Sequence, residues 1–311
     1  MADEDVTIRT RRGTELRAVL RRPDGADTGR LPAVVLCQGL SGVCDVVLPD
    51  IAAALAAAGI VSVRFDYAGY GGSHGERGWI DPPARVVDAQ HVLAWLAAAP
   101  GVDATRLGVY GHSYGGPIAI STAARDRRVR AVVAVSGPAS GRAMLAAARP
   151  AWDWLTFLGR VDAERAAVAA GAEPTIVPTS DLLPLSPAFA AAYAELLGRT
   201  GEQGTSTAVR GAGLGTTEHY LLSADAMLAY DPVDDARKVT GAAVLLVQGE
   251  LDDIALVDDT AALFAALPGI KVWQRVPGIG HLELDHGDGL AGAARLAADW
   301  FTTHLVTPLA G

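Results

Sequence analysis

Cysteine is scarce in this chain, and long apolar runs are missing from it. The two cysteines, Cys37 and Cys44, have no Cys or His partners at zinc-site spacing, so we expect neither a disulfide framework nor a metal. No stretch reaches the roughly 18 uncharged apolar residues that a membrane-spanning helix needs. The charged start MADEDVTIRTRRG also lacks the apolar segment of a secretion signal. We therefore expect a cytoplasmic protein with no membrane partner.

Positive charge is in deficit as well. The 311 residues include 26 Lys and Arg against 35 Asp and Glu, a net charge of −9, and the cations are scattered along the chain. A surface that follows phosphates needs the opposite balance, so we expect no nucleic acid partner. Because half of the residues are hydrophobic, the chain can bury one large core.

Short apolar runs alternate with alanine-rich stretches along most of the chain. Near the start, runs at 6–9 and 16–20 flank a turn and predict an antiparallel hairpin at one edge of a sheet. The later runs are rich in β-branched residues and most are continuously apolar, which is typical of parallel strands covered by helices on both faces. Strands are predicted at 33–37, 60–66, 107–111, 131–136, 243–248 and 270–276, and helices at 48–58, 84–99, 114–125, 256–267 and 288–304.

The alternation of strand and helix stops between residues 141 and 238. This segment carries helical patterns at 142–158 and 186–198, a Gly-, Thr- and Ser-rich stretch at 199–217 that predicts a loop, and no convincing strand. We predict that 141–238 is a helical cap inserted into one α/β core. Residues 1–140 and 239–311 would form that core.

The strongest chemical signal follows the run at 107–111. The sequence GHSYG at 111–115 has the pattern G-x-S-x-G between a predicted strand and a predicted helix. A serine hydroxyl is a weak nucleophile that must project freely, and small residues on either side let the strand and the helix meet at a sharp turn. Ser113 is therefore the predicted nucleophile. The N–H of Tyr114, at the start of the helix, is a predicted donor to an oxyanion.

A nucleophilic serine needs a base and a carboxylate that orients the base, and we searched for both in the chain order Ser, Asp, His. The sequence GELDD follows the strand at 243–248 and makes Asp252 the predicted acid. Asp253 and Glu250 remain rivals, because a shift of one residue in the turn would exchange the carboxylates. His281, in the loop after the strand at 270–276, is the predicted base.

The second oxyanion donor should come from the loop after the strand at 33–37. Gly39 lets the backbone turn inward there, so the Leu40 N–H is the predicted donor. Of the remaining histidines, His112 is expected to support the turn around Ser113. His219, in the cap, is a candidate to face the substrate.

Five motifs in this order make the chain resemble the α/β-hydrolase superfamily over essentially its whole length. They are QGLSG at 38–42, FDYAGYGGS at 65–73, GHSYG at 111–115, GELD at 249–252 and GH at 280–281. The resemblance is greatest to the bacterial dienelactone-hydrolase-related and peptidase-like esterases. It implies the α/β-hydrolase fold: a mostly parallel sheet with an antiparallel N-terminal hairpin, flanking helices and an inserted cap.

The chain departs from the family at two positions. Gln38 stands where the family usually has histidine, and its amide can hydrogen-bond the loop or a substrate. Ser113 stands where dienelactone hydrolases typically carry cysteine, and where dehalogenases and epoxide hydrolases carry aspartate.

Together these residues predict a serine hydrolase that cleaves an ester or thioester of a small or medium apolar acyl substrate through an acyl-enzyme. In the cap, Trp152, Trp154 and Phe157 are candidates to line an apolar pocket, although aromatic residues at this spacing equally form a cap core. The expected partner is a small acyl molecule, no cofactor is expected, and a homodimer is compatible with the sequence.

Two alternatives stay open. The same scaffold can cleave carbon–carbon bonds, or release and cyclise acyl chains in secondary metabolism. A hydrolase scaffold can also serve as a binding protein without activity, because a fold alone does not establish a reaction.

Overall fold

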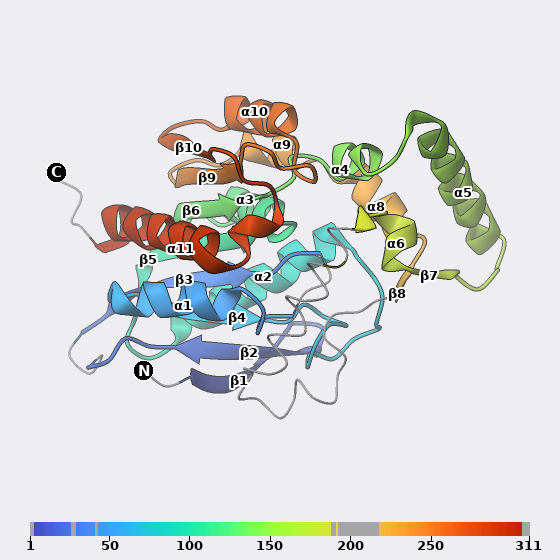
Figure 1. The fold of residues 1–311 in the computed structure, drawn as a ribbon. Helices are drawn as coiled ribbons and strands as arrows, with labels where there is room; N and C mark the ends of the chain where they lie inside the picture. Colours follow the sequence, from blue (N-terminus) through green and yellow to red (C-terminus); the bar gives the residue numbers. More distant parts are fainter. Residues whose placement is uncertain (1–2, 26–28, 41–42, 188–190, 192–217, 307–311) are drawn as a thin grey trace.

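The apolar runs form strands that pair into one sheet of eight (Figure 1). The computed structural model describes residues 3–25, 29–40, 43–187, 191 and 218–306. In spatial order the strands are β1 (Asp3–Arg9), β2 (Glu15–Arg21), β4 (Val61–Phe65), β3 (Leu31–Cys37), β5 (Val102–His112), β6 (Val129–Val135), β9 (Ala243–Gly249) and β10 (Lys271–Val276). β1 pairs antiparallel with β2, and β2 pairs antiparallel with β4. The other neighbours are parallel, which confirms a mostly parallel sheet with an antiparallel N-terminal hairpin.

Helices cover both faces of this sheet because its central strands are apolar on both sides. Val34 and Val35, neighbours on β3, are fully buried in two separate hydrophobic clusters, one on each face. One face carries α1 (Leu48–Ala57) and α11 (Gly287–Phe301), and the other carries α2 (Pro82–Ala98), α3 (Gly115–Arg125) and α10 (Val257–Ala266) (Figure 1). Two short helical turns, η2 (Leu282–Leu284) and η3 (Thr302–Val306), flank α11.

The boundaries of α2 follow from its end residues. Asp81 is the N-cap, and its side chain accepts the Ala84 N–H at 3.0 Å, while Pro82 occupies the first helical position, where no N–H is needed. The helix ends just before Pro100, which cannot continue it. The N-cap at Asp81 thus places the start of this helix two residues before the predicted start at 84.

β5 is longer than predicted. It begins at Val102 rather than 107, because Val102 pairs with Leu31 before a shift in register brings Ala33 opposite Leu107. Residues 102–106 do not form an apolar run, so the sequence pattern does not predict this part of the strand.

Between β6 and β9 the chain leaves the sheet. This part contains α4 (Gly141–Ala147), α5 (Ala151–Ala169), α6 (Thr179–Leu182), α8 (Ser223–Ala229) and α9 (Pro232–Ala236), and the elements α4 to α8 gather at one end of the sheet (Figure 1). The helix predicted at 142–158 is two helices, because Pro150 separates them. Most of the helix predicted at 186–198, and all of the loop predicted at 199–217, lie outside the described residues.

The expectation that this segment has no strand was wrong. β7 (Ile176–Pro178) pairs antiparallel with β8 (Glu218–Tyr220). Each is three residues long, too short for an alternating pattern to show, and their partners are far apart in the sequence.

Two findings bear on the expectations drawn from the lack of long apolar runs and the scarcity of cysteine. None of the described helices combines the length and the apolar character that crossing a membrane requires. Cys37 and Cys44 are both buried free thiols.

Candidate active site

The turn between β5 and α3 carries Ser113 in a strained backbone conformation. Its φ is 49°, in the left-handed region, and its N–H donates to Val135 O at 2.8 Å. A Cβ on Gly111 would lie 2.1 Å from the carbonyl oxygen of Gly115, so only glycine allows this approach of strand and helix. Such strain costs about 1–3 kcal/mol and concentrates at functional sites, so the turn marks Ser113 as a candidate.

Three side chains from separate strand ends meet at this turn. Ser113 Oγ lies 3.0 Å from His281 Nε2, and His281 Nδ1 lies 3.0 Å from both carboxylate oxygens of Asp252. Ser113 follows β5, Asp252 follows β9 and His281 follows β10, so all three lie at the carboxyl ends of parallel strands. We call these three residues the Ser-His-Asp cluster.

Of the three candidate carboxylates, Asp252 is the one that contacts the imidazole. Its Oδ1 also accepts the N–H groups of Ile254 at 3.0 Å and Ala255 at 2.7 Å, which hold the side chain in place. Asp252 is buried, with 5% of its surface exposed. Its rivals in the sequence, Asp253 and Glu250, are exposed.

The surroundings of His281 raise its basicity. Burial lowers the pKa of the imidazole, but the charge and hydrogen bond of Asp252, with the charges of Asp285 and Asp253, outweigh burial and raise the pKa above its ordinary value. A raised pKa makes the imidazole a better acceptor for the Ser113 proton.

The loop after β3 passes directly beside Ser113. A Cβ on Gly39 would lie 3.3 Å from Ser113 Cβ and 3.7 Å from Ser113 Oγ. The Gln38 amide is bonded within this loop, because its Nε2 donates to the carbonyl oxygens of Val43 and Val46 and its Oε1 accepts the Gly39 N–H. Of the two uses left open for Gln38, the structure shows the bonding of the loop.

The two N–H groups predicted to bind an oxyanion, those of Leu40 and Tyr114, have no hydrogen-bond acceptor within the described part of the chain. Tyr114 directly precedes α3, so its N–H lies at the positive end of the helix dipole.

Sequence reasoning missed Arg85, on α2. It donates to Gly39 O at 3.3 Å and to Leu40 O at 2.6 Å, and only 3% of its surface is exposed. The signal for it was an arginine among the core-facing positions of a helix.

A second pair of buried side chains, His112 and Asp285, lies next to the turn that carries Ser113. His112 Nε2 lies 3.0 Å from Asp285 Oδ1, and both side chains are almost fully buried. Asp285 follows η2, which begins right after His281, so this contact links the turn of Ser113 to the loop that carries the imidazole. This agrees with the predicted supporting role of His112.

The three aromatic residues predicted for the cap occupy different environments on α5. Trp152 is 74% exposed, which differs from the expectation that it lines an apolar pocket. Trp154 is half-buried and stacks on Phe157 with 6.1 Å between ring centres. Phe157 is 2% exposed and lies beneath the guanidinium of Arg149 at 3.7 Å, so it is a core residue.

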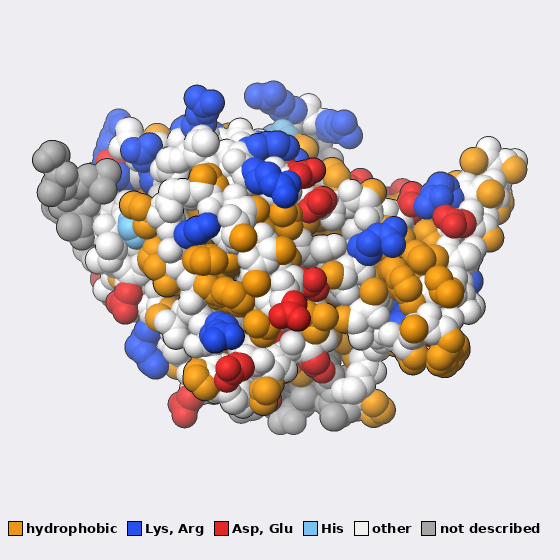
Figure 2. Space-filling model, turned by 90° about the horizontal axis from the view of Figure 1, so that it is seen from above, with side chains coloured by type: hydrophobic (Ala, Val, Ile, Leu, Met, Phe, Trp, Pro, Cys, Tyr) orange, Lys and Arg blue, Asp and Glu red, His pale blue; other side chains and the backbone are white. Residues whose placement is uncertain are grey.

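The exposure of Trp152 is part of a wider feature of the cap. Leu155, on the same helix, is 71% exposed, and Figure 2 shows hydrophobic side chains gathered at the end of the molecule that carries α5. The helix buries only Phe157 and Val161, so its first turns present an apolar surface.

His219, on β8, is fully buried against the core. Its Nδ1 lies 3.5 Å from the hydroxyl of Tyr70. Burial, with the charge of Arg85 adding, lowers its pKa to about 4. The imidazole is therefore neutral at pH 7.

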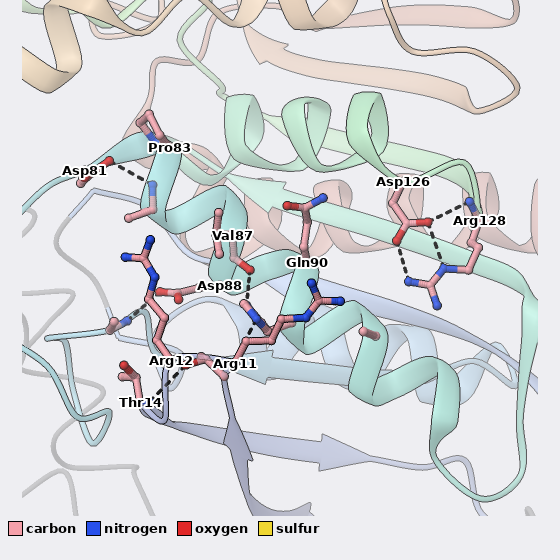
Figure 3. Close-up of a pocket in the computed structure, with 15 residues that line it drawn as sticks. Arg11, Arg12, Thr14, Asp81, Pro83, Val87, Asp88, Gln90, Asp126 and Arg128 are labelled. Atoms are coloured by element: carbon pink, nitrogen blue, oxygen red, sulfur yellow. Dashed lines mark hydrogen bonds and ion pairs between the residues drawn. The ribbon is translucent and has the colours of Figure 1, made fainter.

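A surface groove lies elsewhere, between the hairpin tip and α2 (Figure 3). Arg11 and Arg12 line it from the hairpin, and Asp88 and His91 line it from α2. None of its lining residues belongs to the Ser-His-Asp cluster, so it is not the candidate site. Within the described ranges, no group of three or more His, Cys, Asp or Glu side chains is arranged to hold a metal ion.

The strand order, the N-terminal hairpin and the sharp turn at Ser113 define an α/β hydrolase. The chain is a member of the α/β-hydrolase superfamily. Within that superfamily, residues 30–178 match the family described as serine aminopeptidase, S33.

Relatives match the sequence over part or nearly all of its length. An uncharacterized 31.7 kDa protein from the traX-finO intergenic region of Escherichia coli is 38% identical over 110 residues, 35% of this chain and 38% of that protein, so the match spans well under two thirds of it. Polyketide transferase af380 of Aspergillus fumigatus is 26% identical over 98% of this chain and 99% of its own. A thiohydrolase of Eupenicillium brefeldianum is 27% identical over 83% of this chain and 82% of its own.

Two solved structures share the fold at lower identity. DcsB in complex with its substrate analogue has a TM-score of 0.80 at 23% identity, covering 98% of this chain and 100% of that one. The α/β hydrolase GrgF from Penicillium sp. sh18 has a TM-score of 0.80 at 23% identity, covering 99% of this chain and 100% of that one.

Proposed function

We propose that the protein is a serine hydrolase that cleaves an ester or thioester of a small or medium apolar acyl substrate through an acyl-enzyme. The observation that carries this proposal is the unbroken line of contacts from Ser113 Oγ through both nitrogens of His281 to Asp252, each 3.0 Å long. Proton transfer along such a line needs a base within hydrogen-bond reach of the nucleophile and a carboxylate that fixes the base.

The reaction proceeds in two halves. His281 Nε2 takes the proton of Ser113 as Oγ attacks the acyl carbon, and the carbonyl π electrons move onto oxygen to form a tetrahedral oxyanion. The intermediate collapses, His281 returns the proton to the leaving thiol or alcohol, and the acyl group stays on Ser113. Water then repeats the sequence and releases the acid.

The remaining groups serve this cycle. Asp252 keeps a proton on His281 Nδ1, so that Nε2 is free to accept, and it stabilises the imidazolium that forms. The N–H groups of Leu40 and Tyr114 are the donors that we assign to the oxyanion. The cap segment, 141–238, would select the acyl group, while 1–140 and 239–311 supply the chemistry. Trp154 and Phe157 take part through the packing of the cap.

The relatives favour a thioester over an oxygen ester. One of them is a thiohydrolase and another is a polyketide transferase, names that describe acyl groups released to water or handed to a different acceptor. A transferase is therefore the second candidate: it would share the acyl-enzyme and differ only in the nucleophile that attacks it. The partner is in either case a small acyl molecule.

Substitution of the nucleophile tests the proposal. Ser113→Ala should lower kcat by about 10⁴ to 10⁶ on acyl thioesters while the fold is kept. The matched control is Ser136→Ala: Ser136 directly follows β6, is buried and also has a positive φ, 50°, and this variant should retain activity within a few-fold. A fluorophosphonate should label the wild type and not the Ser113 variant. Equal activity of the wild type and Ser113→Ala, or no labelling, would refute the mechanism, and mass spectrometry of products with added alcohols separates hydrolysis from transfer.

A further inference from the structure

Arg85 is buried, and among the described residues it forms no direct ion pair, although the Asp88 carboxylate on the same helix is near enough to feel its charge. A buried charge without a direct ionic partner is unfavourable unless other groups compensate it. The Arg85 guanidinium lies instead over two aromatic rings, 4.8 Å from the centre of Tyr67 and 4.7 Å from that of Tyr70. Cation–π contacts and two carbonyl oxygens thus make the direct contacts of this cation, and the charge of Asp88 adds to them.

The position of Arg85 gives a role to the sequence motif at 65–73, which takes no part in the proposed reaction steps. Tyr67 and Tyr70 belong to FDYAGYGGS, the segment that follows β4, and both rings are about 1% exposed. The Ala68 N–H donates to Asp88 at 3.0 Å, one turn along α2 from Arg85, so the segment is tied to the same helix. The motif therefore places two ring faces around one guanidinium.

The acceptors of Arg85 belong to the loop beside Ser113. A trans peptide is planar, so the C=O of Gly39 and the N–H of Leu40 point in opposite directions across one plane. When Arg85 holds the Gly39 oxygen on one side, the Leu40 N–H is fixed on the other. The same guanidinium holds the next carbonyl, that of Leu40, and this leaves the peptide little freedom to flip.

We propose that Arg85 is a positioning residue for the oxyanion-binding loop: by holding the carbonyl oxygens of Gly39 and Leu40, it aims the Leu40 N–H at the reacting carbonyl. This inference rests on the proposed function. Arg85 contacts the Gly39 and Leu40 carbonyl oxygens and two tyrosine rings, none of them in the Ser-His-Asp cluster. It acts through the peptide, which it both orients and polarises, so its contribution appears when the oxyanion forms and not when the substrate binds.

Two inhibitors separate these stages. An alkyl trifluoromethyl ketone forms an adduct in which Ser113 Oγ bonds the ketone carbon, the serine proton passes to His281 and the carbonyl π pair becomes an oxyanion. An alkyl thioether of the same chain length binds without reacting. The affinity ratio of ketone to thioether therefore measures formation of the adduct, in which the oxyanion is stabilised, separately from binding of the alkyl chain.

Arg85→Met, which keeps the apolar stem and removes the donors, should lower this ratio and kcat by about 10²-fold, the scale of losing one oxyanion donor. Thioether affinity should stay within about threefold. Arg85→Lys keeps a cation but not the planar fork, so it should lower the ratio by about tenfold. The lysine variant alone decides the matter if the methionine variant does not fold.

Arg149 is the matched control. It too is a buried arginine that lies over an aromatic ring and donates to two successive carbonyl oxygens, those of Asp181 and Leu182, but it lies in the cap. Arg149→Met should lower the melting temperature and leave the ketone-to-thioether ratio unchanged.

An unchanged ratio in the Arg85 variants, or an equal fall in the Arg149 variant, would overturn the inference. A wild type that does not prefer the ketone, or a Ser113→Ala variant that binds it equally well, would instead refute the proposed function.

Discussion

Replacing Asp252 by asparagine tests the orientation of the base. In the structure Asp252 Oδ1 already accepts two backbone N–H groups, from Ile254 and Ala255. An amide in this place would keep its oxygen on those donors and turn its NH₂ toward His281 Nδ1, which lies 3.0 Å away. The imidazole would then have to accept at Nδ1 and carry its proton on Nε2, where it cannot take the proton of Ser113.

The expected loss of kcat is large because His281 would carry its proton on Nε2, the wrong nitrogen, in nearly every molecule of the variant. The corresponding change in a serine protease lowers kcat about 10⁴-fold, which corresponds to about 5.4 kcal/mol of transition-state stabilisation. Asp252→Asn should therefore lower kcat by about 10⁴ with little change in KM. Asp253→Asn, which alters the exposed neighbour, should change kcat by less than about threefold.

The pH dependence supplies an independent readout. The proposed base works in its neutral form, so kcat/KM rises as pH increases through the His281 pKa. Burial lowers this pKa, and the Asp252 charge and hydrogen bond overcome that effect and raise it. Removing the Asp252 charge should lower the pKa and move the acid limb of the profile to lower pH.

The test consists of steady-state kinetics on a p-nitrophenyl ester and an acyl thioester from pH 4 to pH 9. The melting temperatures of both variants are measured alongside. Equal losses in the two variants, or a larger loss in Asp253→Asn, would show that the orienting carboxylate has been assigned wrongly. An acid limb that stays in place in Asp252→Asn would show that the carboxylate does not act on the base.

Three further changes test other parts of the site. Gly111→Ala should destabilise the fold by about 3 kcal/mol or more, because a Cβ there would lie 2.1 Å from a carbonyl oxygen of α3; a wild-type melting temperature would show that the turn can open. Phe157→Ala should cost about 3–5 kcal/mol and Trp152→Ala less than about 0.5 kcal/mol in urea unfolding, and equal costs would contradict their different burial. A double-mutant cycle of His112→Ala and Asp285→Ala should give a coupling energy of about 1–3 kcal/mol, and additivity of the two changes would mean that the contact has no energetic role.

Local patterns reveal the core of the fold and the members of its site, but long-range pairing decides the details. Ser113 and His281 each stand in a glycine-containing motif that follows a predicted strand, so both can be found from neighbouring residues. The choice of Asp252 over Asp253 depends on how the turn after β9 folds, which two N–H donors at 254 and 255 determine. β7 and β8 were missed because neither has a local signal, and each is a strand only by virtue of the other.

Arg85 was also missed because no local sequence pattern points to its role. Everything that makes it informative lies elsewhere in the chain: the carbonyls of Gly39 and Leu40 and the rings of Tyr67 and Tyr70. Trp152 shows the opposite error. Its apolar side chain at a helical spacing suggested an inward position, but the helix that carries it buries only two residues.

The place where segment 141–238 leaves and rejoins the sheet has a consequence for how this protein can change. β6 and β9 are adjacent and parallel, with Ala131 opposite Ala243, and the whole segment between them is a single crossover. Parallel neighbours require a crossover of some length in any case, and lengthening a connection costs only about 0.6 kcal/mol for each doubling. The three residues of the Ser-His-Asp cluster all lie outside the crossover, so its replacement would leave their strand ends in register. If this segment selects the acyl group, as proposed, a replacement that keeps its contacts with the core would change that selection while the reaction centre stays in place.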